Sequence, residues 1–210
     1  MQNNANSLVI LDFETSGLSP DSGDRAIEIG AVRITDGQVT GHFQELMDPG
    51  FRINTFIENY TGITNKMLKA APPCADVMAR FAEFVGDDNL VAHNASFDKR
   101  FLEAEFEQIS TQYLGSFACS LLVARRLYPH APDHKLGTLV RYKNISAAGS
   151  FHRALFDAQM TAKLWLAMLD DICLQANITN VPFSLIQTLS KTPKNQIAKL
   201  LAKYSINECV

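Results

Sequence analysis

A short apolar run at residues 8–11 leads directly into the acidic triplet Asp12-Phe13-Glu14. A run of this length, rich in β-branched residues, is typical of a buried central strand. Side chains alternate across a strand, so Asp12 and Glu14 share one face and Phe13 takes the other. Two carboxylates side by side at the end of a buried strand repel each other and are costly to desolvate. Such a strand either holds a cation between its acids or runs out into a polar turn.

The ligand atoms and the residues after Glu14 indicate which metal ions could bind here. Ligand sets made only of oxygen suit Mg²⁺ or Mn²⁺ rather than Zn²⁺. Thr15, Ser16 and Gly17 end the strand, and Gly17 lets the backbone come close to whatever the metal ion holds. Residues 8–17 therefore predict a divalent-metal site at the end of a central strand.

The composition indicates an ordinary globular protein. The chain of 210 residues is long enough to bury a sizeable core in one domain, with room for a small appendage. Its residues are 47% hydrophobic and 20% charged. The formal charge of -3 at pH 7 excludes a strongly basic nucleic-acid coat. It does not exclude a compact enzyme that meets phosphates through metal ions and backbone amides.

The cysteines and the N-terminus indicate a cellular compartment. The four cysteines show no C-x-x-C spacing, so we expect free thiols in a reducing cytosol and no zinc site. The first seven residues are polar and lack the basic and apolar segments of a signal peptide. No apolar window approaches the length of a membrane span. We therefore expect a cytoplasmic protein with no membrane partner.

Three strands are expected in the first quarter of the chain. Residues 25–35 alternate apolar and polar side chains, which is typical of a half-exposed strand. The dipeptide Asp36-Gly37 is a strong hairpin signal, and residues 38–47 form the return strand. Together with the strand that ends in the acidic triplet, they are predicted to form one antiparallel meander.

The middle of the chain alternates helices with short strands, as breaker residues and the apolar spacing indicate. The expected elements, in chain order, are a short helix or set of turns at 59–68, a helix at 76–85, a buried strand at 90–92, a helix from about 96, a strand at 115–119, helices at 120–127 and 136–142, and the longest helical pattern at 151–175.

Two further acids and a histidine lie near these elements. Asp98 opens a helix after a short strand, a position that acids also take for structural reasons. Asp157 is flanked on one helical face by small residues, which would let the helix press it against the strand ending at Asp12. An exposed helical acid is the alternative. His152 precedes Asp157 by five residues, which is not one helical face. We place it in the preceding loop, above the site, unless it is a surface or capping residue.

Three segments taken together match a known pattern. Residues 11–17 read LDFETSG, residues 92–98 read AHNASFD, and residues 152–158 read HRALFDA. In this order and spacing they closely resemble the motifs of the DEDDh, or DnaQ-like, family of 3′–5′ exonucleases. The resemblance covers residues 8–175, and no metal-binding or base position departs from the family pattern. The residues from 176 onward match nothing in it.

The resemblance implies a ribonuclease H-like α/β fold, a mixed five-stranded sheet flanked by helices. It implies the stepwise removal of nucleoside 5′-monophosphates from nucleic-acid 3′ ends. Asp12, Glu14, Asp98 and Asp157 would hold two divalent ions, Mg²⁺ or Mn²⁺, and His152 would be the general base. The chemistry is coherent, because two ions stabilise the attacking and departing oxygens while an imidazole removes a proton near neutral pH.

The resemblance also implies a place for the end of the strand. The backbone around Thr15, Ser16 and Gly17 would meet the terminal nucleotide, and Leu18 would lie beside its base. Phe97 is a candidate for stacking on a base, although core packing is the favoured interpretation of this residue. The expected partner is a single-stranded 3′ end, and a polymerase or another protein is a candidate second partner.

Several functional alternatives stay open. DNA is the favoured substrate, with RNA or very short oligonucleotides as the main alternative, because no residue is identified as one that must read the 2′-hydroxyl. A non-catalytic binding subunit on the same fold is less favoured, since the acids and His152 are all present. A zinc or serine hydrolase is not expected, because the chain has no His/Cys cluster and no G-x-S-x-G motif.

The end of the chain differs from the rest. Residues 180–182 resemble a linker, and Thr192 followed by Pro193 predicts a short helix at 193–204. We expect an exonuclease domain at residues 1–178 and a helical extension at residues 179–210. The extension carries four lysines and one glutamate. It either packs on the domain or contacts nucleic acid or a partner through its lysines.

Overall fold

The computed structural model describes residues 4–147, 149 and 152–207. Expectations that fall on Phe151 and on the thiol of Cys209 lie outside the described residues. The elements, in chain order, are β1 (Leu8–Thr15), η1 (Pro20–Ser22), β2 (Ala26–Thr35), β3 (Gln38–Leu46), α1 (Thr55–Thr61), α2 (Asn65–Lys69), α3 (Cys74–Val85), β4 (Leu90–Ala92), α4 (Ser96–Gln108), β5 (Phe117–Cys119), α5 (Ser120–Leu127), α6 (Leu136–Tyr142), α7 (Ala154–Ala176), α8 (Phe183–Lys191), η2 (Lys194–Gln196) and α9 (Ile197–Asn207).

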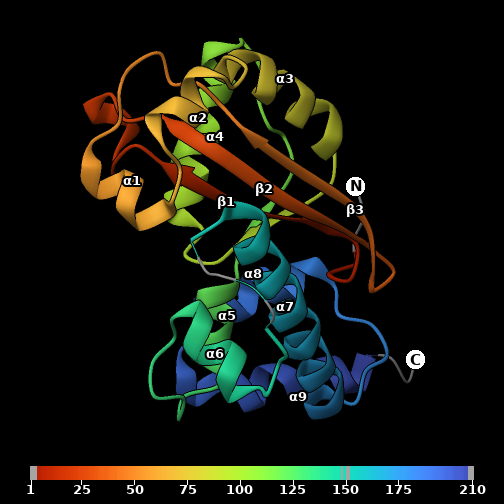
Figure 1. Ribbon diagram of the computed structural model, residues 1–210. Helices are drawn as coiled ribbons and strands as arrows, with labels where there is room; N and C mark the ends of the chain where they lie inside the picture. The colour runs from red at the N-terminus through yellow and green to blue at the C-terminus, as the bar shows by residue number, and fades with distance from the viewer. Residues whose placement is uncertain (1–3, 148, 150–151, 208–210) are drawn as a thin grey trace.

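A mixed sheet forms the middle layer (Figure 1). In the described part of the chain it has five strands, in the order β3-β2-β1-β4-β5. β2 is antiparallel to both β1 and β3, whereas β4 is parallel to β1 and β5. Asp36 and Gly37 both have positive φ, 50° and 77°, as a tight hairpin between β2 and β3 requires. The predicted meander and the predicted ribonuclease H-like sheet with flanking helices are confirmed.

The alternation of β1 divides the core into two layers. Leu8 and Ile10 belong to the apolar cluster that also includes residues of α5 to α9. Val9, Leu11 and Phe13 belong to the cluster with α3 and α4. Figure 1 shows these two groups of helices on opposite faces of the sheet. Because Asp12 and Glu14 continue the face of Leu8 and Ile10, their side chains lie on the α7 side.

The expectation that the second strand is half exposed is wrong. β2 lies between β1 and β3, and all its residues except Arg33 and Thr35 are buried. Glu28 is fully buried there, but its carboxylate accepts hydrogen bonds from the guanidinium of Arg153 and the backbone N–H of Ala154. A buried charge is tolerated when it is paired in this way, and the alternation pattern does not reveal the partner.

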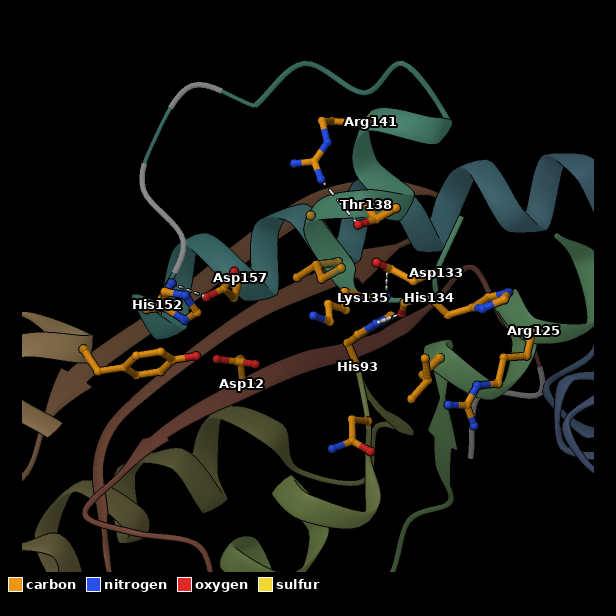
Figure 2. Close-up of a pocket in the computed structure, with 15 residues that line it drawn as sticks. Asp12, His93, Arg125, Asp133, His134, Lys135, Thr138, Arg141, His152 and Asp157 are labelled. Carbon is orange, nitrogen blue, oxygen red and sulfur yellow. Dashed lines mark hydrogen bonds between the residues drawn. The ribbon is translucent and has the colours of Figure 1, made fainter. Parts of the chain in front are cut away.

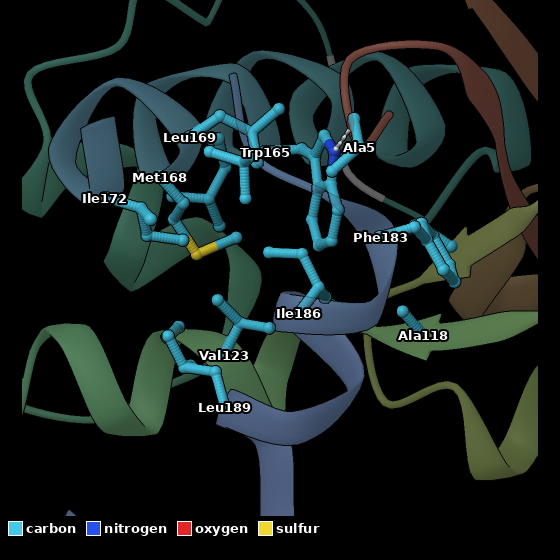
Figure 3. Close-up of a cluster of buried hydrophobic side chains, with 14 of the residues drawn as sticks. Ala5, Ala118, Val123, Trp165, Met168, Leu169, Ile172, Phe183, Ile186 and Leu189 are labelled. Carbon is cyan, nitrogen blue, oxygen red and sulfur yellow. Dashed lines mark hydrogen bonds between the residues drawn. The ribbon is translucent and has the colours of Figure 1, made fainter. Parts of the chain in front are cut away.

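The longest helix, α7, packs on β1 and β2 and carries Trp165 into the larger apolar cluster. Helix α8 adds Phe183, Ile186 and Leu189 to that cluster (Figure 3). The indole N–H of Trp165 donates to the carbonyl of Ala5 at 2.8 Å. The start of the described chain, α7 and α8 therefore share one core.

The C-terminal segment is more helical than expected. Helix α8 begins at Phe183, directly after the residues expected to be a linker. The helix expected at 193–204 is divided between η2 and α9. Both α8 and α9 contribute buried residues to the core around Trp165. The described part of this segment therefore packs on the rest of the protein.

Two further observations concern the expectations drawn from composition. Cys74 and Cys119 form no disulfide. Among the described helices, none combines the length and the apolar character that crossing a bilayer requires.

Candidate active site

Three carboxylates meet at the end of β1. Asp12 and Glu14 belong to β1, and Asp157 belongs to the first turn of α7. Each offers an oxygen atom, and these oxygens all lie within 4.8 Å of one another. Figure 2 shows Asp12 and Asp157 facing the same space, with His152 beside Asp157. The fold thus joins acids that stand far apart in the sequence.

The start of α7 comes unusually close to the sheet. Gly30 of β2 pairs with Asp12 of β1, and a Cβ atom at Gly30 would overlap the backbone of Ala154 and Leu155. The absence of a side chain at this point lets the first turn of α7 lie directly on β2. This close approach is what carries Asp157 to the end of β1.

The electrostatics of the acids reflect their crowding. Burial, followed by repulsion from Asp98, Asp157 and Glu14, raises the pKa of Asp12 well above its usual value. Burial is also the main reason that the pKa of Glu14 rises to about 8, and repulsion from Asp157 adds to it. Burial raises the pKa of Asp157, against a hydrogen bond from the backbone N–H of His152. Such shifts are typical of functional sites.

Asp98 lies beside this group. It is buried in the first turn of α4, and its Oδ1 accepts a hydrogen bond from the backbone N–H of Phe13 at 3.2 Å. Burial raises the pKa of Asp98 to about 7, against that hydrogen bond. The carboxylate oxygens that lie within 4.8 Å of one another come from Asp12, Glu14 and Asp157, and Asp98 is not among them. Asp98 is nevertheless a neighbour of this group, because its charge helps to raise the pKa of Asp12.

His152 lies in the segment before α7, where the chain turns toward the acids. Its backbone is in the left-handed region, with φ of 70°, and its N–H donates to Oδ2 of Asp157 at 2.8 Å. Its ring packs against the ring of Tyr60, with 4.2 Å between the centroids. Tyr60 in turn stacks on Phe56, one helical turn earlier in α1, at 5.8 Å. His152 is therefore held over the site by two contacts, its backbone hydrogen bond to Asp157 and the packing of its ring on Tyr60.

Sequence analysis missed Tyr60 and Phe56. Their spacing of four residues places them on one face of α1, which was the available signal. Nothing in the local pattern shows that this face lies against His152, because the two segments are brought together only by the packing of α1 over the end of β1.

A pocket of about 560 Å³ opens beside the acids, between the end of β1 and α1. Thr15, Gly17, Leu18 and Phe97 line it, as does Tyr60. The side chain of Leu18 is 78% exposed at this place. Phe97 both lines the pocket and packs on the ring of Phe101, with 5.0 Å between the centroids.

Hydrogen bonds hold the loop that follows β1. The hydroxyl of Thr15 donates to the carbonyl of Gly17 at 2.6 Å. The hydroxyl of Ser16 accepts a hydrogen bond from the backbone N–H of Arg25 at 3.0 Å. Ser16 does not line the pocket, whereas its neighbours Thr15 and Gly17 do. The structure thus uses the Ser16 side chain within the loop.

His93, at the end of β4, joins three elements. Its Nδ1 lies 2.9 Å from the hydroxyl of Ser120 and its Nε2 lies 2.9 Å from the carbonyl of His134. Burial lowers the pKa of His93 to about 4, so the ring is neutral at pH 7. Sequence analysis assigned no role to this residue, which ties β4 to α5 and to the loop before α6.

A second pocket, of about 870 Å³, adjoins the first at the acids. The residues that line both pockets are Asp12, Tyr60, His93, Asn94, His152 and Asp157. The outer wall of the second pocket comes from α5, α6 and the loop between them. The acids therefore lie where two adjoining pockets meet.

The donor set at the end of β1 fits a divalent metal ion. Carboxylate oxygens are the ligands that Mg²⁺ and Mn²⁺ prefer, and the mutual repulsion that raises the pKa of Asp12 is what a cation would offset. Among the described residues, Asp12, Glu14 and Asp157 form the one cluster of acids, histidines or cysteines close enough to share an ion.

Known proteins show similar sequences. The sequence model of the RNase_T family, described as an exonuclease, matches residues 9–165. The chain is 39% identical over 163 residues to the DNA polymerase III PolC-type of Listeria welshimeri, and 38% identical over 165 residues to that of Bacillus subtilis. These matches cover 77% and 78% of this chain and 11% of each relative. The chain thus spans about a tenth of the length of the curated relatives it matches.

Solved structures show a similar fold. Exonuclease X in complex with 5′ overhanging duplex DNA has a TM-score of 0.65 at 26% identity, over 92% of this chain and 99% of that one. The nuclease domain of 3′hExo, a DEDDh family member bound to rAMP, has a TM-score of 0.68 over 84% of this chain and 96% of that one. At 18% identity, the second likeness shows the fold alone.

Proposed function

This chain belongs to the RNase_T exonuclease family, in the DEDDh group of 3′–5′ exonucleases, and on that premise we propose that it shortens DNA strands from their 3′ ends. The observation that carries the proposal is the meeting of Asp12, Glu14 and Asp157 within 4.8 Å, next to His152. Acids in this arrangement suit metal-assisted hydrolysis of a phosphodiester, whose own negative charge repels a nucleophile.

We assign the binding of two divalent ions, Mg²⁺ or Mn²⁺, to Asp12, Glu14 and Asp157, with Asp98 completing the set. Two such ions, when bound, stabilise the charge on the attacking and departing oxygens of the phosphodiester. The support from this chain is the all-oxygen donor set and the repulsion among the four carboxylates. Family membership supports a divalent-metal requirement in general.

We assign the role of general base to His152. Its ring lies at the junction of the two pockets and rests on Tyr60, so it is placed to accept a proton from a water molecule near Asp157. As that proton leaves, the water oxygen bonds to phosphorus and the bond from phosphorus to the 3′ oxygen breaks. The released 3′ oxygen takes up a proton from solvent and becomes a 3′-hydroxyl. The products are a nucleoside 5′-monophosphate and a strand one nucleotide shorter.

The terminal nucleotide belongs in the pocket between β1 and α1. Thr15 and Gly17 line this pocket, and Leu18 and Phe97 form part of its wall. We assign the backbone of residues 15–17, including Ser16 between the two lining residues, to contact with the terminal nucleotide. Aromatic and apolar walls bind any base through stacking, without reading its sequence. The volume of about 560 Å³ is in the range of small-molecule sites.

DNA is the preferred substrate in this proposal. The relatives that match most of the chain are named DNA polymerase III, and the solved structure at 26% identity is named as a complex with duplex DNA. The family relationship does not distinguish DNA from RNA, so the substrate rests on these names and is decided by assay.

The test is digestion of matched single strands of DNA and RNA, labelled at their 5′ ends. With Mg²⁺ or Mn²⁺ we expect a ladder that shortens one nucleotide at a time, faster for DNA, and no digestion with EDTA. Asp157→Asn is the matched control, since it keeps the shape of the side chain. We expect its rate to fall on the order of 10³-fold, the loss of several kcal/mol of charge stabilisation.

The outcomes separate the alternatives. Faster digestion of RNA would overturn the DNA preference and keep the exonuclease. Binding of strands without shortening, unchanged in Asp157→Asn, would favour a non-catalytic subunit. Internal cleavage, seen as products that do not follow a ladder, would contradict action at the 3′ end.

We also propose that the chain acts beside a DNA polymerase. The support is that its relatives are much longer chains named DNA polymerase III PolC-type, of which the chain matches about a tenth. Sedimentation of this protein mixed with the replicative polymerase of its own organism should show a joint complex. Independent sedimentation of the two, at concentrations of tens of micromolar, would reject the partnership and leave the nuclease untouched.

A further inference from the structure

The two pockets that meet at the acids differ in charge. The pocket between β1 and α1 has no lysine or arginine among its lining residues in the described chain. The second pocket is lined by Arg125 of α5, Lys135 just before α6, and Arg141 of α6. All three side chains are exposed. We call the wall made by these three cations the basic half.

The cations of the basic half are available to a ligand. The ion pairs of the described residues involve other side chains, and Arg141 makes one donation, to the hydroxyl of Thr138 at 3.3 Å. One acid, Asp133, lies among them. Its carboxylate already accepts the backbone N–H of Lys135 at 2.8 Å, which is the main cause of its lowered pKa. Asp12 and Asp157 also line this pocket, at its inner end. Away from those two acids, three positive charges face one locally bonded carboxylate.

Figure 2 shows how the cations lie relative to the acids. Lys135 projects into the space near Asp157 and His93, Arg141 lies beyond Thr138, and Arg125 lies on the far side of His134. The cations are thus spread along the pocket instead of meeting at one point. A row of charges suits a ligand with repeated anions better than a single phosphate.

We propose that the basic half binds the backbone phosphates on the 5′ side of the scissile bond, so that a strand runs from α5 and α6 across the acids to the pocket beside α1. This inference rests on the proposed function and deepens it. Only the terminal nucleotide needs the aromatic pocket. The nucleotides that precede it bring one phosphate each, and the binding of phosphates by Lys and Arg sets the register of a strand without reading bases.

The consequence is a minimum length for efficient digestion. A dinucleotide has one phosphodiester, and this group lies at the acids when it is cleaved. The basic half then has no phosphate to bind. Longer strands bring further phosphates to it. The geometry therefore points to single strands as the substrate class and sets this protein apart from enzymes that finish very short oligonucleotides.

The test compares two double variants that remove the same charge. Lys135→Ala with Arg141→Ala removes two cations of the basic half. Lys66→Ala with Lys69→Ala is the matched control, because these lysines line a separate pocket that shares no residue with the two at the acids. Binding of a 5′-labelled DNA octamer is followed by fluorescence anisotropy in Ca²⁺ over a series of salt concentrations. Thermal melting checks that both variants are folded.

We expect the first variant to weaken octamer binding on the order of tenfold and to lower the salt slope by about 0.7 for each phosphate that the variant no longer neutralises. The ratio of kcat/KM for octamer to kcat/KM for dinucleotide should fall by a similar factor, and the control should match the wild type in both measurements. Equal binding, slope and ratio in the two variants would overturn the proposal. Failure of the wild type to hydrolyse any strand in Mg²⁺ would instead reject the exonuclease, and the binding measurement would still decide the basic half.

Discussion

His152 is positioned by residues that are remote from it in the sequence. Its backbone N–H is bonded to Asp157, and its ring rests on Tyr60, which stacks on Phe56. A histidine on a short segment before a helix has many accessible rotamers, and each contact removes some of them. Tyr60 is therefore a positioning residue for the imidazole.

We predict that Tyr60→Ala lowers kcat on the order of tenfold, whereas Tyr60→Phe stays within about twofold of the wild type, because the phenyl ring keeps the packing against His152. Steady-state kinetics on a DNA strand measures both values. A Tyr60→Phe variant as slow as Tyr60→Ala would show that the hydroxyl, and not the ring packing, is what matters.

The acids make the stability of the metal-free protein depend on pH. The pKa of Glu14 is raised from 4.5 to about 8 in the folded chain. Between these values the unfolded chain binds fewer protons than the folded one at this residue, so the free energy of unfolding falls as pH rises. A bound cation offsets the charge and removes the penalty.

We therefore predict that the melting temperature in EDTA declines from about pH 4.5 to about pH 8 and that Mn²⁺ reduces the decline. Glu14→Gln is the control, since its side chain does not titrate. Its decline in EDTA should be shallower than that of the wild type, and the raised pKa values of Asp12, Asp98 and Asp157 account for the decline that is left. Calorimetry at several pH values makes the comparison. A wild-type decline no steeper than that of Glu14→Gln would contradict the shift.

At the scale of the elements, the packing of the first turn of α7 on β2 places Asp157 in the site. Gly30 leaves the space into which the backbone of α7 fits. Glu28, two residues earlier in the same strand, receives the guanidinium of Arg153 at 2.7 and 3.0 Å. Close packing and the ion pair of the partly exposed Arg153 with the buried Glu28 thus set the position of Asp157 from the neighbouring strand.

We predict that Gly30→Ala costs about 1–3 kcal/mol of stability, as overpacking does, and weakens Mn²⁺ binding because α7 is displaced. Gly41→Ala in β3 is the control, since a Cβ atom there would meet its nearest neighbours at an ordinary 3.5 Å. Urea unfolding and metal titration measure the two effects. Equal stability and metal affinity in the two variants would contradict the close approach.

At the scale of the whole molecule, helices α8 and α9 pack in the same apolar core as one face of the sheet. Ile186 and Leu189 of α8 pack near Trp165 and Met168 of α7 (Figure 3). The family model ends at residue 165, so a chain cut at that boundary would expose the apolar face of α7. We infer that the C-terminal segment stabilises the domain.

We predict that Ile186→Ala lowers the free energy of unfolding by about 2–5 kcal/mol, while Lys199→Ala, an exposed change on α9, stays within about 0.5 kcal/mol. Urea unfolding decides this. The alternative, a lysine face that binds nucleic acid, predicts the reverse pattern in octamer affinity, with Lys199→Ala weakening it and Ile186→Ala leaving it unchanged.

Local patterns in the sequence predicted most of the elements and pointed to Asp12, Glu14, Asp98 and Asp157 as candidate ligands. The apolar run at residues 8–11, the dipeptide Asp36-Gly37 and the small residues around Asp157 each carry their information within a few positions. Strand alternation, turn chemistry and helical spacing are local rules, so they suffice for such features. The three segments that resemble the DEDDh motifs then indicated that the acids belong to one site.

Only the tertiary structure decided which faces meet. The burial of β2, the packing of Tyr60 on His152, the joining of α8 to the core and the row of cations at Arg125, Lys135 and Arg141 all depend on the packing together of segments distant in the chain. The periodicity of a helix or strand predicts the face on which each residue lies. The partner on that face is set by how the helices pack on the sheet. Pairing across such distances is determined by the free energy of the whole packed core, to which no short stretch of sequence has access.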